Sequence, residues 1–131
     1  MPRQTPPTDR LLRGRRAYAA GQDAEALAAE ALTAEGWLIL AQRCRTEAGE
    51  IDLIAERDGL LAFIEVKARP SLAEAAFALG PRQRTRLVAA ADAWLAEHPG
   101  HGAAGTRFDV MLVAADGTIR RIADAFRIEE T

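Results

Sequence analysis

The sequence of 131 residues has little of what defines several classes of protein. One cysteine, Cys44, can form neither an internal disulfide nor a zinc site built from several thiolates. The longest uninterrupted apolar run, 110–115, is far shorter than the roughly 20 residues that span a bilayer. The basic N-terminus lacks the apolar stretch of a signal peptide. We therefore expect a cytoplasmic protein with no membrane partner.

A strong excess of one charge sign is also absent. Lysine and arginine sum to 17 and aspartate and glutamate to 19, which gives a net charge of −2 and excludes a protein whose whole surface coats nucleic acid. A local basic patch is compatible with this balance. Only one of the 17 basic residues is a lysine, Lys67. Composition alone favours chance for this single lysine, but a compact ammonium with a tunable pKa is also kept where a guanidinium cannot replace it.

Length and patterning predict one α/β domain over residues 15–131, preceded by a flexible basic arm at 1–14. Helix-forming residues with an apolar stripe predict a first helix over 15–35. A second helix is expected to begin at Pro81, since proline fits the first turn, and to run to about residue 97.

Short apolar and branched segments predict five strands, at 37–41, 50–57, 60–69, 107–115 and 118–122. Asp-Gly pairs at 58–59 and 116–117 favour tight turns, so two antiparallel hairpins are expected. The segment 71–79 is interpreted as part helix and part loop. The order of helix, three strands, helix and two strands indicates a mixed central sheet flanked by helices.

The first hairpin is expected to gather ionisable side chains on one face. A two-residue loop at 58–59 pairs positions whose numbers sum to 117, so Asp52 is expected opposite Glu65, and Glu50 opposite Lys67. Paired residues point to the same face of a sheet. One patch then collects three carboxylates and the lysine, and the other face takes Ile51, Leu53, Ile64 and Val66.

Carboxylates so close together need compensation. Two of them about 5 Å apart repel by roughly 1 kcal/mol in water and about 3 kcal/mol at an effective dielectric near 20. A divalent cation reverses this sign, and Mg²⁺ or Mn²⁺ prefers hard oxygen ligands. The pattern indicates a metal site at Asp52 and Glu65, with Lys67 placed to orient or deprotonate water or to neutralise charge on a phosphate. A solvated hairpin face, in which Glu50 pairs with Lys67, stays open.

The segments GEIDLI at 49–54 and FIEVKAR at 63–69 resemble the PD-(D/E)XK nuclease signature, in the form of the YraN-like family, which is similar to archaeal Holliday junction resolvases. The resemblance covers residues 21 to about 126. It includes three shorter pieces, GQDAE at 21–25, RQ at 82–83 and RFDV at 107–110. Ile51 stands where the signature has proline, and Arg82 stands where a lysine is expected.

The resemblance implies a restriction-endonuclease-like core and an endonuclease that hydrolyses phosphodiester bonds. It favours DNA over RNA, and the resolvase relatives suggest branched or damaged DNA. It implies Asp52, Glu65 and the backbone carbonyl of Val66 as metal ligands. Lys67 then becomes the catalytic lysine, and Glu25 an added acidic group from the first helix.

Residues around this cluster are expected to support it. Gln83 falls in line with the inner face of the second helix, where its amide could hold a water or a phosphate, and helix capping is an equal alternative. Asp109 is expected to pair with Arg107 or Arg120 as a structural residue. The arginines expected to grip a nucleic-acid backbone are Arg82, Arg84, Arg86, Arg15 and Arg16, with solvated helix faces as the alternative.

Functions of other classes stay open beside the nuclease. One is a non-catalytic nucleic-acid-binding module that retains the nuclease fold. Another is an adaptor whose helices dock a protein partner and whose charged hairpin is merely solvated. Metal dependence separates these functions from the nuclease, and a homodimer is a further open partner.

Overall fold

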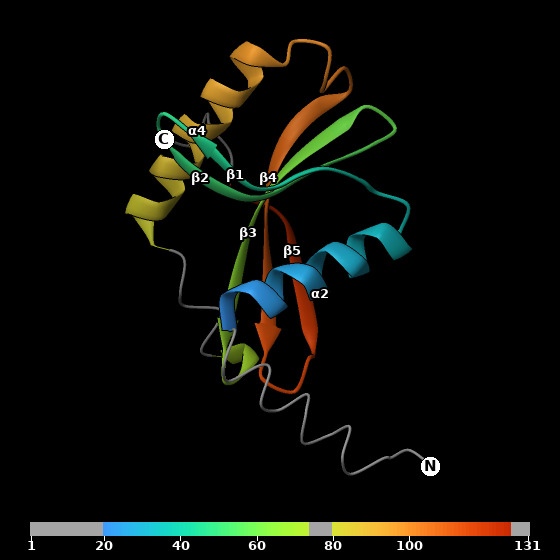
Figure 1. Cartoon of the computed structure of the whole chain (residues 1–131), viewed down its shortest axis with the longest axis vertical. Helices are drawn as coiled ribbons and strands as arrows, with labels where there is room; N and C mark the ends of the chain where they lie inside the picture. The colour runs from blue at the N-terminus through green and yellow to red at the C-terminus, as the bar shows by residue number, and fades with distance from the viewer. Residues whose placement is uncertain (1–19, 74–79, 127–131) are drawn as a thin grey trace.

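The computed structural model describes residues 20–73 and 80–126. The expected arm at 1–14, the neighbouring Arg15 and Arg16, and residues 74–79 lie outside this part of the chain. The elements follow in the order α2 (Ala20–Ala34), β1 (Leu38–Thr46), β2 (Gly49–Arg57), β3 (Leu60–Arg69), α4 (Pro81–Glu97), β4 (Gly105–Ala114) and β5 (Ile119–Phe126) (Figure 1).

The helix boundaries follow from the residues at their ends. Pro81 occupies the start of α4, where its missing N–H leaves no helical hydrogen bond unmade. Gly36, with a left-handed φ of 94°, ends the first helix, and the N–H of Trp37 then bonds the carbonyl of Leu32. Within the described residues, neither helix is long and apolar enough to cross a membrane.

The five strands form one mixed sheet in the order β1-β2-β3-β4-β5. β3 and β4 run parallel with α4 between them in the chain, and the other neighbouring strands are antiparallel. The predicted mixed sheet flanked by helices is therefore confirmed. β1 is longer than the expected 37–41, because the polar residues 42–46 continue the ladder with β2 through their backbone at the sheet edge.

The turn of the first hairpin sets its register as predicted. Asp58 and Gly59 both have positive φ, 52° and 82°, which is the type I′ conformation. Residues 53–57 then pair with 60–64, each pair in the expected register. Near the loop, turn chemistry therefore determines which residues are neighbours.

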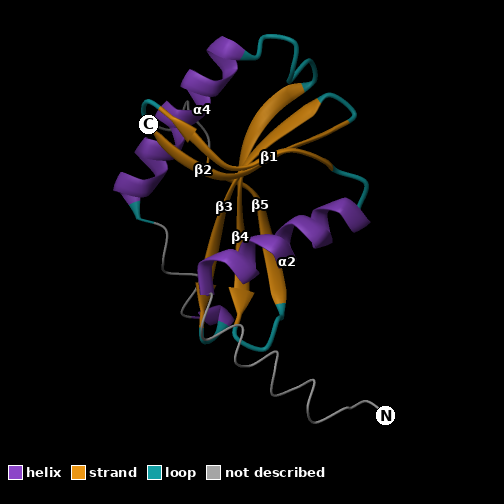
Figure 2. Cartoon of the chain, viewed as in Figure 1, coloured by secondary structure: helices purple, strands orange, loops and turns teal. Residues whose placement is uncertain are grey.

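Further from the loop the predicted pairing is wrong. The β2–β3 ladder ends at Leu53↔Ile64, so the expected pairs of Asp52 with Glu65 and of Glu50 with Lys67 do not form in the described sheet. Glu50 pairs instead with Arg45 of β1. The strands separate because β2 stays with β1 while β3 continues along β4. Figure 2 shows β1 and β2 fanning away from β3, β4 and β5.

Where the ladder ends, the side chains of β2 also stop alternating regularly between the two faces of the sheet. Ile51 packs in the apolar cluster beneath α4, whereas Leu53 and Ile64 pack in the cluster beneath α2. Arg43, on the neighbouring β1, adopts a left-handed φ of 51° at this level, which interrupts the regular pleat. The common face expected for Ile51, Leu53, Ile64 and Val66 is therefore wrong for Ile51.

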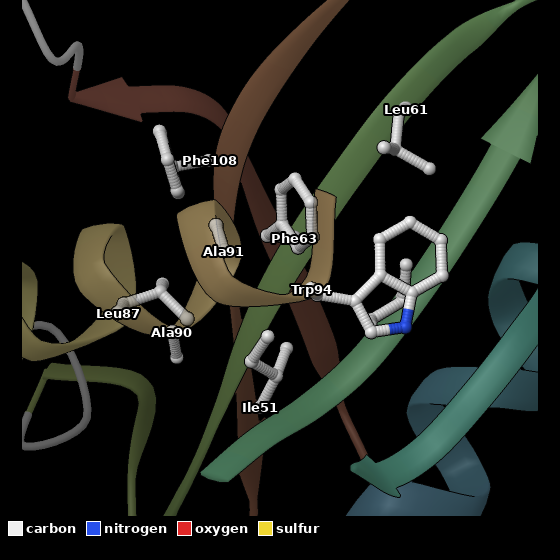
Figure 3. Close-up of a cluster of buried hydrophobic side chains, with 9 residues drawn as sticks. Ile51, Leu61, Phe63, Leu87, Ala90, Ala91, Trp94 and Phe108 are labelled. Carbon is white, nitrogen blue, oxygen red and sulfur yellow. The ribbon is translucent and has the colours of Figure 1, made fainter. Parts of the chain in front are cut away.

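Two apolar clusters cover the two faces of the sheet. The cluster under α4 contains Ile51, Ile54, Leu61, Phe63, Leu87, Ala90, Ala91, Trp94 and Phe108 (Figure 3). Phe63 lies at its centre, with ring centroids 5.9 Å from Trp94 edge-on and 5.8 Å from Phe108 in a stack. Its neighbour Ile64 packs in the other cluster, with Leu32 of α2. The two helices therefore lie on opposite faces.

Asp109 is a structural residue, as expected. Its side chain is fully buried, Oδ1 lies 3.0 Å from Nε of Arg107, and the same oxygen accepts a hydrogen bond from the N–H of Asp124. This carboxylate ties β4 to β5 in place of a regular ladder bond, at the register shift between Phe108 and Val110.

Candidate functional site

A pocket of about 320 Å³ opens where β2 and β3 separate. Its walls are formed by Gly49, Glu50 and Asp52 of β2, Glu65 of β3, and Gln83, Arg86 and Leu87 of α4. Four residues singled out from the sequence, Asp52, Glu65, Gln83 and Arg86, therefore meet in one pocket. The fork in the sheet provides the opening, and the start of α4 closes one side.

Asp52 is held at the fork by β3. Its Oδ2 accepts a hydrogen bond of 2.8 Å from the N–H of Val66. Burial raises the pKa of Asp52 to about 7, with Glu65 and Glu25 adding to the rise and the Val66 N–H and Lys67 opposing it. Loss of solvation is thus the main reason why the ionised form of Asp52 is disfavoured, and the neighbouring carboxylates add to it.

Lys67 is buried and paired within β3. Its Nζ lies 3.0 Å from Oε2 of Glu65, two residues earlier on the same face, and the lysine is 9% exposed. The solvated hairpin face with a Glu50–Lys67 pair is therefore wrong, because Glu50 lies at the pocket mouth with its Oε2 3.9 Å from Nε of Arg45. The ammonium therefore lies behind Glu65, and Lys67 itself does not line the pocket.

Glu25 reaches the acidic cluster from α2, although it does not line the pocket. Burial raises its pKa, Arg43 lowers it, and Glu50 and Glu65 raise it further, while a hydrogen bond with Asp52 lowers it. Its Oε1 is buried, lies 3.3 Å from Nε of Arg43, and has no hydrogen-bond partner among the described residues. Glu25 is therefore electrostatically coupled to the site.

The residues of α4 divide into two groups. Gln83 lines the pocket, and its buried Oε1 has no hydrogen-bond partner in the described part of the chain. No side-chain hydrogen bond caps this helix, so the capping alternative for Gln83 is not formed. Arg86 also lines the pocket, whereas Arg82 and Arg84 are exposed on the helix outside it.

Three residues of the site were not singled out as such from the sequence. Glu50 belonged to the predicted acidic patch and could have been included from it. Gly49 stands in the GEIDLI segment, and its φ of 144° is a conformation that favours glycine. Arg43 gave no sequence signal, because its approach to Glu25 depends on an irregular backbone at the sheet edge.

Comparisons with known proteins place this chain among close relatives. The family model described as "Uncharacterised protein family UPF0102" matches residues 24–113, a range that includes the pocket. The UPF0102 protein of Granulibacter bethesdensis is 60% identical over 121 residues, which cover 92% of this chain and 77% of the relative. One from Rhodopseudomonas palustris is 50% identical over 110 residues, 84% of this chain and 85% of the relative. One from Azorhizobium caulinodans is 49% identical over 126 residues, 95% and 96% of the two chains. The chain therefore belongs to the UPF0102 family, which is the family that the YraN-like resemblance predicted.

Proposed function

We propose that this protein is a metal-dependent endonuclease that hydrolyses phosphodiester bonds in DNA. The observation that carries the proposal is the meeting of Asp52 and Glu65 in one pocket, with the ammonium of Lys67 3.0 Å from Glu65. These residues belong to the two segments that resemble the PD-(D/E)XK signature. A mixed sheet with a helix on each face is compatible with the restriction-endonuclease-like core that the resemblance implies.

The donor set suits a hard divalent cation. Asp52 of β2 and Glu65 of β3 offer carboxylate oxygens. The backbone carbonyl of Val66, which follows Glu65 on β3, offers a third oxygen. Burial raises the pKa of Asp52 to about 7 because it disfavours the ionised form, and a bound cation would stabilise that form. The described residues contain no three His, Cys, Asp or Glu side chains that could hold a metal alone, so water would complete the set, as Mg²⁺ and Mn²⁺ accept.

Each protein group then has a role in hydrolysis. A bound divalent ion would stabilise negative charge on the reacting phosphate. The ammonium of Lys67 uses one donor on Glu65 and has two more, which would orient the attacking water or bind a phosphate oxygen. Asp52 is fixed through Oδ2 by Val66, and the free amide oxygen of Gln83 would accept a hydrogen bond from water. Glu25 would support Asp52 from the side.

Basic residues near the pocket would bind the rest of the substrate. Arg82 and Arg84 are exposed on the helix that closes the pocket, where they would contact phosphates of the backbone. Arg15 and Arg16 have the same proposed role, although they lie outside the described residues. The choice of DNA over RNA, and of branched or damaged DNA, comes from the resemblance to resolvases.

The test is cleavage by the purified protein under single-turnover conditions. Labelled linear, forked and four-way DNA would be incubated with Mg²⁺ or Mn²⁺, with Lys67→Ala and the better-packing Lys67→Met as matched variants. We expect the wild type to cleave at least one substrate and both variants to bind DNA in Ca²⁺ with a cleavage rate lower by on the order of 100-fold.

Other outcomes select other functions. Cleavage retained in both Lys67 variants would assign the activity to a contaminant or another site. DNA binding without cleavage by the wild type in either metal would favour the non-catalytic binding module. Absence of DNA binding would favour the protein adaptor.

A further inference from the structure

Arg86 brings a positive charge into the acidic pocket from α4. Among the described residues that line the pocket, it is the one with a cationic side chain, and it shares the pocket with Glu50, Asp52 and Glu65. Within the part of the chain that the structure describes, no carboxylate forms an ion pair with Arg86. Its guanidinium is therefore free to bind an anion that enters from outside.

Gly49 makes room for the stem of Arg86. A Cβ atom at position 49 would lie 2.9 Å from Cγ of Arg86, closer than Cβ atoms pack in proteins, and 3.1 Å from Cδ, which is also a tight contact. The φ of Gly49, 144°, is also one that other residues rarely adopt. Arg86 thus crosses the bare backbone at the start of β2, and the contact restricts where its guanidinium can lie.

A phosphate entering this pocket meets three carboxylates, which repel it. A guanidinium offsets that repulsion and offers two parallel N–H donors that match two phosphate oxygens, a geometry that lysine lacks. Because the stem of Arg86 is held against backbone, its guanidinium has less conformational freedom than that of a solvated arginine. Less entropy is therefore lost when it binds a phosphate.

We infer that Arg86 binds the reacting phosphate in the pocket, and that Gly49 is its positioning residue. The inference rests on the proposed function and adds to it, because it separates Arg86 from the arginines of α4 that lie outside the pocket. It predicts that Arg86 acts on the rate of cleavage more than on the affinity for DNA.

The first experiment separates rate from affinity. DNA affinity would be measured by fluorescence anisotropy in Ca²⁺, and the single-turnover rate at saturating protein in Mn²⁺. We expect Arg86→Ala to lower the rate on the order of 100-fold, and Arg86→Lys about tenfold, with less than about a threefold change in Kd. Arg120→Ala is the matched control, because Arg120 is an exposed arginine on β5 outside the pocket. A wild-type rate in Arg86→Ala, or an equal loss in the control, would overturn the inference.

A double-mutant cycle tests the role of Gly49. We expect Gly49→Ala to slow cleavage at saturation by about tenfold or more, and the double variant with Arg86→Ala to be no slower than Arg86→Ala alone. A merely structural defect would multiply the two losses, and that result would remove Gly49 from its positioning role. The Arg86 variants change an exposed side chain and do not strain the backbone, so they test the inference even where Gly49→Ala folds poorly.

A final measurement does not depend on cleavage. Inorganic phosphate would be titrated into ¹⁵N-labelled protein in EDTA at constant ionic strength, and the Nε–H signal of Arg86, identified by its loss in Arg86→Lys, would be followed by NMR. We expect a saturable shift in the wild type and a weaker one in Gly49→Ala. Such a shift in a protein that cleaves no DNA would refute the nuclease and leave the phosphate site standing. A cleaving protein without the shift would refute this inference alone.

Discussion

The carboxylate of Asp52 accepts a hydrogen bond from the backbone N–H of Val66 at the place where β2 and β3 stop pairing. A side chain there does what a strand carbonyl does in the regular ladder. This hydrogen bond therefore joins β2 to β3 where the ladder ends, and it fixes the position of the Asp52 side chain relative to β3.

Replacing Asp52 with asparagine removes a half-buried charge and keeps an oxygen for the Val66 N–H. At pH 8 the wild-type carboxyl is ionised in spite of a pKa raised to about 7. In EDTA we expect Asp52→Asn to melt about 4 °C higher than the wild type, a shift worth about 1 kcal/mol in a domain of this size. Mn²⁺ should raise the Tm of the wild type and leave Asp52→Asn and Asp52→Ala unchanged. Equal Mn²⁺ shifts in scanning fluorimetry would remove Asp52 from the metal ligands.

The ion pair between the buried Lys67 and the half-buried Glu65 predicts strong energetic coupling. Their side chains are 11% and 16% exposed, so Glu65→Gln removes the carboxylate that pairs directly with the ammonium and leaves Asp52 as the nearby counter-charge. We expect a loss of about 3 kcal/mol in Glu65→Gln, and recovery of most of it in the double variant with Lys67→Met, since the buried charge is then gone. Urea denaturation in EDTA measures both. Additive losses would mean that the two groups do not stabilise each other.

The turn at Gly59 predicts a backbone effect. Its φ is 82°, and a Cβ there would lie 3.3 Å from the backbone nitrogen of Ala104. We expect Gly59→Ala to cost about 1–2 kcal/mol of unfolding free energy. Gly100→Ala is the control, because a Cβ at Gly100 meets nothing within 4 Å and its φ is ordinary, so the change should stay within about 0.5 kcal/mol. Equal effects at both glycines would contradict the assigned turn.

Glu56 predicts a pH dependence. The N–H of Gly102 and the ring of His101, each 2.8 Å from one carboxylate oxygen, hold the pKa of Glu56 below its usual value near 4.5. Because the folded pKa is lower than the unfolded one, the stabilisation is complete above about pH 5 and disappears as the pH falls through the folded pKa. The advantage of the wild type over Glu56→Gln in unfolding free energy should therefore shrink on acidification below about pH 5. An advantage that stays constant or grows would contradict this sign.

Local chemistry made much of the fold predictable. Asp58-Gly59 sets the hairpin turn and its nearby register, and Pro81 sets the start of α4. The end of the β2–β3 ladder was not predictable, because it depends on each strand following a different neighbour. The left-handed conformation of Arg43 was not predictable either, since nothing in the neighbouring sequence favours it.

The sequence predicted which residues lie at the site better than it predicted which of them contact one another. Asp52 and Glu65 meet in one pocket and Lys67 lies beside Glu65, so the predicted residues are close together, but the ladder arithmetic gave Lys67 the wrong partner. The arginines of α4 were grouped from composition alone. A sharper signal was available, because Arg86 stands three positions after Gln83 and so lies on the same side of a helix.

Leu87 belongs both to the cluster around Phe63 and to the wall of the acidic pocket. One wall of the pocket is thus also part of the apolar core that stabilises the fold. A cavity opened beneath α4 would displace Gln83 and Arg86 without touching either residue. A core substitution there would therefore alter the geometry of the pocket, and any activity that depends on it, at temperatures at which the protein is still folded.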